Sequence, residues 1–250
     1  MRPLEGKDRL IVALDVPSPA EAAAVVDNLP DVSFYKIGWE LFMAGVMKGE
    51  LKPLLDRLKS KRLFIDLKIP GDIDNTVGSV VRLCVEIGNV ELLTVSESMA
   101  PKTIGAAAAA RQGSQNPKLL MVPLLSSLDA ADLRGMAGPE VSVEQHILRK
   151  ATNAMRSGCD GVIASGDAIR LCRENLPEGT LIVSPGIRRA GSSTDDHKRL
   201  TTPGDAIRAG SDYLVVGRPI VKSENPAEGA RRIIEEIDLA LQEAGRLVRT

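Results

Sequence analysis

The chain has 250 residues, the usual size of one α/β barrel, so a second domain is not required. Its net charge of −1 argues against a positive surface that would attract nucleic acid, and its 2% aromatic content argues against platforms on which bases stack. Hydrophobic residues make up 44%, yet no apolar stretch approaches the length of a membrane span. We therefore expect one soluble domain covering residues 1–250, with no nucleic-acid or membrane partner.

The N-terminus and the cysteines indicate the compartment. Residues 1–8 are charged and lack the apolar core of a signal peptide behind them, which argues against secretion. Cys84, Cys159 and Cys172 form no C-x-x-C pair, and only two histidines are present, so we expect no zinc site. These features predict a cytoplasmic, free-standing protein with buried free thiols and no metal or other cofactor.

Short apolar segments recur along the chain, and most lack the alternation of a strand with one exposed face. Segments with helical periodicity lie between them. The expected strands are Leu10–Val16, Phe34–Gly38, Leu63–Leu67, Leu92–Val95, Leu119–Leu125, Gly161–Ala164, Leu181–Val183 and Tyr213–Val216. Strand and helix repeated eight times favour a (β/α)8 TIM barrel. A doubly wound open sheet has similar periodicity, but no G-x-G-x-x-G motif follows the first strand.

Three predicted helices begin with one design, in which an N-cap oxygen precedes a proline and an acid follows two residues later. The three starts are Ser18-Pro19-Ala20-Glu21, Thr202-Pro203-Gly204-Asp205 and Asn225-Pro226-Ala227-Glu228. Ser126–Val141, in contrast, contains two glycines and a proline. We expect this segment to be the longest irregular insertion and a mobile flap.

Polar residues lie at or just after the carboxyl end of nearly every predicted strand. The positions are Asp15, Lys36, Asp66 with Lys68, Ser96 with Glu97, Ser126 with Ser127, Pro185-Gly186-Ile187-Arg188, and Gly217-Arg218. The carboxyl ends of barrel strands meet at one mouth, where active sites form. Stability alone does not require charges at so many of these ends, so the pattern predicts an active site.

The last two strand ends suggest a phosphate site, because loops seven and eight usually bind phosphate in this architecture. Gly217 would let a backbone amide approach the anion, and Arg218 would donate a forked pair of hydrogen bonds. A surface arginine beside a turn glycine is the competing interpretation.

Asp66-Leu67-Lys68 is the predicted centre of the site. Strand alternation points Asp66 and Lys68 to the same side, into the mouth. A lysine flanked by carboxylates keeps its proton, because nearby negative charge favours the ammonium form. Such a group suits proton donation to carbon better than Schiff-base chemistry, which needs a neutral amine. An ordinary surface ion cluster remains the alternative from this segment alone.

Taken together, these motifs resemble the orotidine 5'-monophosphate decarboxylase family. The resemblance at the first three strands rests on Ala13-Leu14-Asp15, Tyr35-Lys36-Ile37-Gly38, Asp66-x-Lys68 and Asp72-Ile73-x-Asn75-Thr76. At the last two strands it rests on Ser184-Pro185-Gly186-Ile187-Arg188 and Val216-Gly217-Arg218-Pro219-Ile220. The matches follow the family's order from the first strand to the last, so they cover essentially the whole chain.

The resemblance implies decarboxylation of orotidine 5'-monophosphate to uridine 5'-monophosphate, in de novo pyrimidine biosynthesis. Lys68 would protonate C6 of the pyrimidine as carbon dioxide leaves, with Asp66 against the substrate carboxylate and Lys36 bridging Asp66 and the ribose hydroxyls. Asp72 and Thr76 would reach the neighbouring subunit's site, which implies a homodimer. The other implied contacts are Asp15 with the nucleoside, Ser126 and Ser127 with the pyrimidine edge, Arg188, Gly217 and Arg218 with the phosphate, and Pro185–Arg199 as a closing loop.

Three features depart from the family pattern. The family usually has two residues between its lysine and second aspartate, whereas Ile69-Pro70-Gly71 makes three here. Strand four commonly ends in a His-Ala pair, but this chain has Ser96-Glu97-Ser98-Met99. His197 stands where a glutamine usually links phosphate and base. It can still donate a hydrogen bond to the substrate, and a solvated loop histidine is the alternative. His146, in a helical segment, is expected to be structural.

Two rival functions stay open. The first rival is a metal-dependent enzyme with the same barrel, such as 3-keto-L-gulonate 6-phosphate decarboxylase or hexulose phosphate synthase. Enzymes of this kind have a carboxylate on strand two. Lys36 stands there in this chain and would repel a divalent cation. The second rival is a catalytically inactive phosphate-binding or scaffold protein. The altered end of strand four and the longer loop after Lys68 support it, whereas the intact set of Asp66, Lys68 and Asp72 argues against it.

Overall fold

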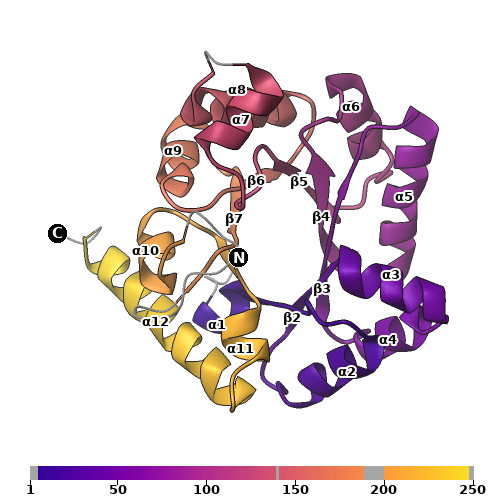
Figure 1. Cartoon of the computed structure of the whole chain (residues 1–250), viewed down its shortest axis with the longest axis vertical. Coiled ribbons are helices and arrows are strands. Elements are labelled where there is room, and N and C mark those ends of the chain that lie inside the picture. Colours follow the sequence, from indigo (N-terminus) through magenta and orange to yellow (C-terminus); the bar gives the residue numbers. More distant parts are fainter. Residues whose placement is uncertain (1–4, 139–140, 189–199, 248–250) are drawn as a thin grey trace.

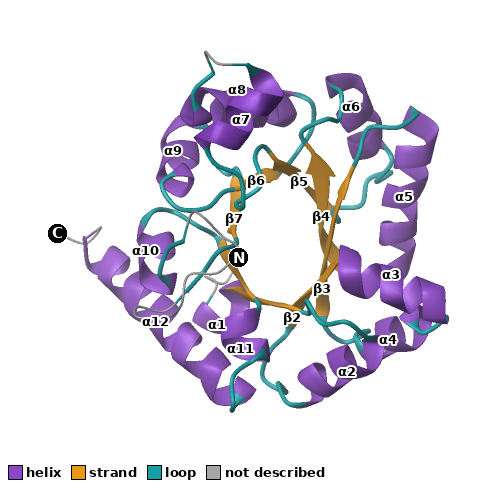
Figure 2. Ribbon diagram, viewed as in Figure 1, coloured by secondary structure: helices purple, strands orange, loops and turns teal. Residues whose placement is uncertain are grey.

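The fold is a closed barrel of eight parallel strands in the computed structural model, which describes residues 5–138, 141–188 and 200–247 (Figures 1 and 2). Each strand pairs with the next one in the chain, and β8 pairs with β1 to complete the circle. The strands are β1 Leu10–Ala13, β2 Phe34–Gly38, β3 Arg62–Ile69, β4 Val90–Ser96, β5 Lys118–Val122, β6 Gly161–Ile163, β7 Leu181–Ser184 and β8 Tyr213–Val216. The (β/α)8 prediction is confirmed, and the open-sheet alternative is wrong.

Helices surround the barrel and cover its outer face (Figure 2). They are α1 Gly6–Arg9, α2 Pro19–Asp27, α3 Trp39–Lys48, α4 Leu51–Arg57, α5 Asp74–Ile87, α6 Pro101–Ala109, α7 Ala130–Ala137, α8 Val143–Arg156, α9 Ala168–Asn175, α10 Pro203–Arg208, α11 Arg218–Val221 and α12 Pro226–Leu247. Within the described residues, no helix has the length and apolar character needed to cross a bilayer.

The three helix starts with a proline are capped as the sequence predicts. The Ser18 hydroxyl accepts a hydrogen bond from the backbone N–H of Glu21 at 3.2 Å, and Thr202 caps α10 in the same way at 3.1 Å. The side-chain oxygen of Asn225 accepts from the N–H of Glu228 at 3.1 Å. Each cap satisfies an amide that has no partner inside its own helix.

The expectation of an irregular flap over Ser126–Val141 is wrong for much of that segment, because it contains helix α7. The Asp129 carboxylate caps this helix by accepting from the N–H groups of Ala131 and Asp132. The Asp132 side chain in turn accepts from the N–H of Asp129 at 2.9 Å. The side chain of Leu133 is completely buried and anchors the helix to the barrel. The Asp129-x-x-Asp132 spacing was the available sequence signal.

Side chains that point into the barrel form an apolar layer below a polar one. Their apolar members are Ile11, Ala13, Phe34, Phe64, Leu92, Leu120, Val183 and Val215. Since strand side chains alternate, the next inward residue lies two positions further toward the carboxyl end. By this rule the next inward side chains are Lys36 after Phe34, Asp66 after Phe64 and Thr94 after Leu92. The fold therefore places three polar side chains from adjacent strands directly above a packed hydrophobic floor.

The three cysteines are buried free thiols, as expected. Burial raises the pKa of both Cys84 and Cys172 to about 11, because it disfavours the thiolate. Neither group is therefore reactive at neutral pH.

Candidate active site

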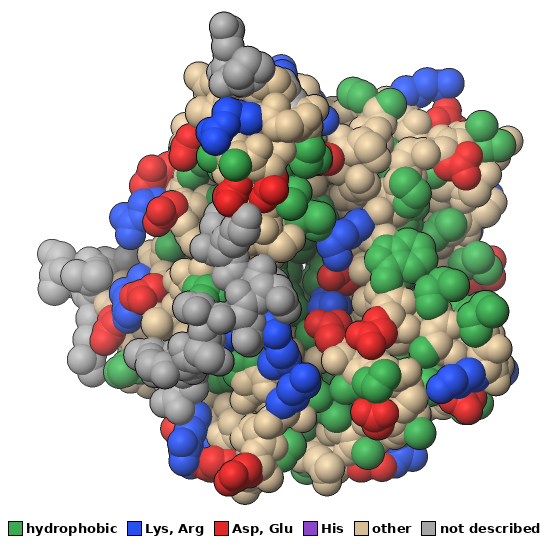
Figure 3. All heavy atoms as spheres, in the orientation of Figure 1, with side chains coloured by type: hydrophobic (Ala, Val, Ile, Leu, Met, Phe, Trp, Pro, Cys, Tyr) green, Lys and Arg blue, Asp and Glu red, His purple; other side chains and the backbone are tan. Residues whose placement is uncertain are grey.

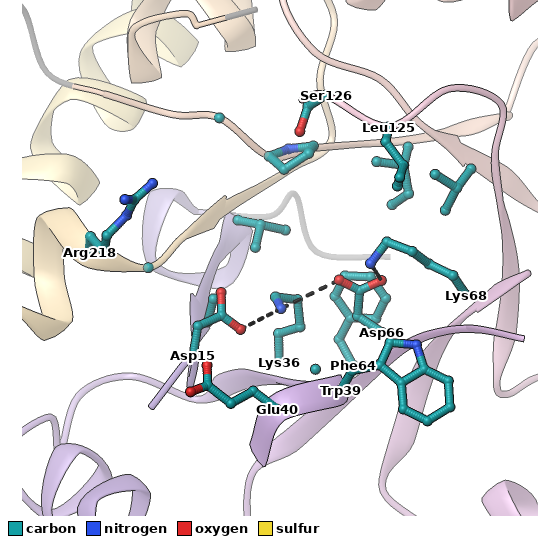
Figure 4. A pocket seen from close by; sticks show the side chains of 18 of the residues that line it. Asp15, Lys36, Trp39, Glu40, Phe64, Asp66, Lys68, Leu125, Ser126 and Arg218 are labelled. Atoms are coloured by element: carbon teal, nitrogen blue, oxygen red, sulfur yellow. Dashed lines mark hydrogen bonds and ion pairs between the residues drawn. The ribbon is translucent and has the colours of Figure 1, made fainter. Parts of the chain in front are cut away.

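A cavity of about 520 Å³ opens at the carboxyl ends of the strands, and Figure 3 shows charged side chains gathered around it. Asp15, Lys36, Asp66 and Lys68 line it together. Arg218 lies across the cavity from Lys68 in the close view of Figure 4. The structure thus brings the predicted acid–lysine cluster and the predicted phosphate site into one pocket.

The four charged residues form a continuous chain of ion pairs (Figure 4). Lys36 Nζ lies 2.9 Å from Asp15 Oδ1 and 3.4 Å from Asp66 Oδ2. Lys68 Nζ lies 2.9 Å from the other oxygen of Asp66. The exposed fractions of these side chains are 53% for Asp15, 9% for Lys36, 14% for Asp66 and 34% for Lys68. The chain therefore begins at the rim, passes through a buried centre and returns to the open cavity.

The buried centre of this chain is ionised. Burial by itself would raise the pKa of Asp66, but the charges of Lys36 and Lys68 and hydrogen bonds from Lys68 and Thr94 hold it below its usual 3.8. Burial would likewise lower the pKa of Lys36, yet Asp66 and then Asp15 keep it above its usual 10.5. A carboxylate and an ammonium group are consequently fixed next to each other inside the barrel at neutral pH.

Lys68 and Asp66 meet through a distortion of β3 that the sequence did not predict. Ile65 pairs with Leu93 and Ile69 pairs with Val95, so three residues of β3 face the single residue Thr94 on β4. Lys68 has φ 45°, in the left-handed region that non-glycine residues seldom adopt. Simple alternation correctly predicts that both side chains share the pocket, but a bulge directs the lysine there.

The opposite wall of the pocket carries the residues predicted to bind phosphate. Pro185, Gly186, Arg188, Gly217 and Arg218 all line it. Gly186 has φ 76°, which a side chain would strain, so glycine suits the turn that follows β7. The Arg188 side chain is buried and donates to the carbonyl of Ile187 at 2.9 Å. Two guanidinium groups therefore flank a wall in which glycines let backbone amides approach an anion.

Other predicted site residues lie outside this pocket. Asp72, Thr76 and Ser127 are exposed and do not line it, whereas Ser126 does. The Asp72 carboxylate accepts a hydrogen bond from the N–H of Ile73 at 2.6 Å. His197 lies outside the described residues, as does most of the predicted closing loop.

The structure also brings in residues that the sequence interpretation missed. Trp39 and Glu40 begin α3 and line the pocket, and Lys222 joins Arg218 near the last strand. A side chain at Gly38 would place its Cβ 3.1 Å from Lys36 Nζ, so glycine leaves room for the ammonium group. The available signal for Trp39 and Glu40 was their position directly after strand two.

Two departures from the family pattern lie side by side. The backbone of Gly71, in the longer loop after Lys68, approaches Ser98 so closely that an added Cβ would lie 3.4 Å from the Ser98 carbonyl oxygen. In the same altered strand-four end, the Glu97 carboxylate lies 2.7 Å from His146 Nε2. The carbonyl of Pro123 lies 3.1 Å from the same nitrogen. His146 therefore joins the loops after β4 and β5, in keeping with the structural role expected for it.

A closed (β/α)8 barrel with a charged cavity at the carboxyl ends of its strands is the architecture of barrel enzymes. Residues 8–233 match the model of the orotidine 5'-phosphate decarboxylase / HUMPS family, and the chain belongs to this family.

Named relatives support the same assignment. The chain is 43% identical to an orotidine 5'-phosphate decarboxylase of Afipia carboxidovorans, over 95% of this chain and 98% of that protein. It is 42% identical to one of Methylococcus capsulatus, with 94% of each chain covered. The crystal structure of orotidine 5'-phosphate decarboxylase from Lactobacillus acidophilus superimposes with a TM-score of 0.77, at 31% identity, over 92% of this chain and 98% of that one.

Replacing Lys36 tests the electrostatics of the buried centre. Lys36→Met leaves Asp66 buried without one of its two cations, which costs about 3–5 kcal/mol of unfolding free energy. Because the pKa of Asp66 is lowered in the fold, its contribution is fully present above the usual 3.8 and is lost as pH falls through the lowered value. Because the pKa of Lys36 is raised in the fold, its own contribution is fully present below the usual 10.5 and is lost as pH rises through the raised value.

Urea unfolding of the wild type and of Lys36→Met across the pH range measures the difference in their free energies of unfolding. We expect the largest stability difference near neutral pH, with a smaller one at both extremes. Lys52→Met is the matched control, because Lys52 pairs with Asp56 on the surface and its side chain is 83% exposed. A Lys36→Met deficit that stays constant with pH would contradict the ionised centre.

Proposed function

We propose that this chain decarboxylates orotidine 5'-monophosphate to uridine 5'-monophosphate, a step of pyrimidine nucleotide synthesis, without a metal or other cofactor. The observation that carries the proposal is the placement of Lys68 Nζ 2.9 Å from Asp66, at the open side of the ion-pair chain. A fixed ammonium group in this position faces the cavity in which a substrate would lie. The names of the relatives at 42–43% identity favour this substrate over a sugar phosphate.

The proposed reaction breaks the bond between C6 and the carboxylate, and the electron pair stays on C6. Lys68 donates its proton to that carbon, and carbon dioxide leaves. Asp66 lies against the substrate carboxylate, but two like charges about 4 Å apart repel by only about 4 kcal/mol at an effective dielectric of 20. Enzymes lower barriers by roughly 8–23 kcal/mol, so repulsion is the smaller contribution. The larger one is the preorganised Lys68 ammonium, which faces the negative charge as it develops.

The remaining groups bind and orient the nucleotide in this proposal. Lys36 contacts the ribose, Asp15 contacts the nucleoside, and Ser126 and Ser127 contact the pyrimidine edge. Arg188, Gly217 and Arg218 hold the phosphate end. His197, the further substrate-binding residue that we propose, lies outside the described residues, as does most of the predicted closing loop. Binding of the remote phosphate orients the ring against Lys68, which raises kcat as well as affinity.

We also propose that a single catalytic domain, residues 1–250, works as a cytoplasmic homodimer with shared active sites. Asp72 and Thr76 are exposed and do not line the pocket of their own chain, so they are available to a partner. Figure 3 shows hydrophobic side chains gathered over α3, on the surface beside the pocket. Trp39, Met43 and Met47 contribute to this patch with exposed fractions of 49%, 44% and 78%. We propose that a second copy of this chain covers the patch.

The rival metal-dependent sugar-phosphate reaction is less compatible with this site. Lys36 occupies the strand-two position and already neutralises Asp66 and Asp15 from within hydrogen-bonding range. A divalent cation would have to displace that buried ammonium group. Because the family model covers both activities by its description, an assay with a chelator separates them.

Loss of ultraviolet absorbance on adding the protein to orotidine 5'-monophosphate tests the reaction. We expect turnover to persist in EDTA, and Lys68→Ala to slow it by about 10²–10⁴-fold or more, because the general acid is removed. Lys52→Ala, which removes an exposed lysine, should retain full activity. Activity that EDTA abolishes and magnesium restores would favour the metal-dependent rival.

Arg218→Ala tests the phosphate site. Loss of charge-assisted hydrogen bonds of about 1.5–3 kcal/mol should lower kcat/KM by roughly 10–100-fold while the fold stays intact. The defect should be confined to the phosphorylated substrate, so the slow reaction of orotidine should not change. Arg208→Ala provides a surface control, since Arg208 pairs with Asp205 and Glu243 on the far helices. Equal losses of activity on orotidine 5'-monophosphate and on orotidine would contradict the assignment of Arg218 to the phosphate.

Mixing two inactive variants tests the shared sites. If Asp72 acts in the partner's pocket, a dimer of Lys68→Ala and Asp72→Ala chains contains one intact site. Random exchange of subunits should then restore about one quarter of wild-type activity. Lys68→Ala mixed with Asp66→Ala is the matched control, because each change spoils the pocket of its own chain, so both pockets of the mixed dimer are defective and no intact site can form. Recovery in neither mixture, despite exchange shown by differently tagged subunits, would contradict shared sites.

A further inference from the structure

We propose that Thr94 is a positioning residue, whose hydroxyl holds the bulge of β3 in the shape that aims Lys68 and Asp66 at each other. The inference rests on the proposed function for its kinetic consequence, but the geometry is independent of the substrate. Thr94 is not among the residues that line the pocket, so it acts through the two residues that do.

The first observation is the gap in the strand ladder. Between the pairs Ile65–Leu93 and Ile69–Val95, β3 has three residues and β4 has only Thr94. A bulge of this kind leaves backbone groups without their regular partners on the neighbouring strand. The amide of Lys68 lies within it, on a backbone with φ 45°. Such a conformation persists only when the surrounding structure compensates for it.

The second observation is that Thr94 supplies the missing partner. Its hydroxyl oxygen accepts a hydrogen bond from the backbone N–H of Lys68 at 2.8 Å. The same hydroxyl donates its hydrogen to Asp66 Oδ1 at 3.0 Å. One group thereby satisfies the unusual backbone of the lysine and orients the carboxylate that pairs with the lysine side chain.

Burial makes this arrangement specific to a hydroxyl. Thr94 is fully buried, so water does not replace its hydrogen bonds when they are lost. Asp66 Oδ1 also accepts from Lys68 Nζ at 2.9 Å, so both hydrogen bonds converge on one oxygen. If the hydroxyl is removed, the carboxylate can rotate and the bulge can relax, and both changes move the ammonium group relative to C6 of the substrate. Displacements of about 1 Å at a reacting centre cost on the order of 10²-fold in rate.

Thr94→Val and Thr94→Ser test the proposal, because valine keeps the shape and removes the hydroxyl, while serine keeps the hydroxyl. We expect Thr94→Val to lower kcat by about 10²-fold with a much smaller change in KM, since the phosphate wall is intact. Thr94→Ser should restore most of kcat. Thr180→Val is the matched control: Thr180 is also buried and donates to the carbonyl of Pro177 at 2.7 Å, but it does not line the pocket.

The acid side of the pH profile gives a readout that a merely structural defect would not move. Thr94 helps Lys36 and Lys68 to lower the pKa of Asp66, so its loss should shift the acid limb of kcat to higher pH. A crystal structure of Thr94→Val should show Lys68 outside the left-handed region or its Nζ detached from Asp66. Wild-type kcat and an unmoved acid limb in Thr94→Val, or equal losses in Thr180→Val, would overturn the proposal. Failure of the wild type to convert the nucleotide would instead reject the function, and the crystal structure would still test the geometry.

Discussion

The site depends on one buried carboxylate. Asp66 is held between Lys36 and Lys68 inside the barrel, where burial alone would favour its neutral form. Two cations and a hydroxyl are needed to keep it charged, and they come from β2, β3 and β4. The three strands must therefore keep their register to within one residue, since a slip would turn one of these side chains out of the barrel. The hydrophobic floor beneath them, with Phe34 and Phe64, secures that register by close packing.

This constraint explains why the backbone of β3 is irregular where the strand reaches the site. Lys68 has to project into the cavity and still contact Asp66, two residues before it on the same strand. A regular strand separates such neighbours, whereas a bulge with a left-handed residue brings the ammonium group back onto the carboxylate. Local strain is thus concentrated where the proposed chemistry occurs, and tertiary packing compensates for it.

Two of the departures from the family pattern lie in loops around the mouth of the barrel. The longer loop after Lys68 and the altered end of β4 contact each other at Gly71 and Ser98, so the two departures from the family pattern fit together in space. Glu97 and His146 attach that end of β4 to α8. These changes lie beside the ion-pair chain and leave its four members in contact, which agrees with membership of the family.

The sequence by itself determined the order of the elements and the chemistry of the mouth. Continuous apolar segments require strands covered on both faces, and the charges after them collect at one end because parallel strands share a direction. The sequence missed α7, whose Asp129-x-x-Asp132 cap was hidden by glycine and proline nearby. It also missed the partnership of Thr94 with Lys68, as well as Trp39 in the pocket wall. α7 and Trp39 had local signals, whereas the bulge at Lys68 and its hydrogen bond with Thr94 were decided by tertiary structure alone, since a bulge and a shared register arise from contacts between strands far apart in the chain, which no local periodicity records.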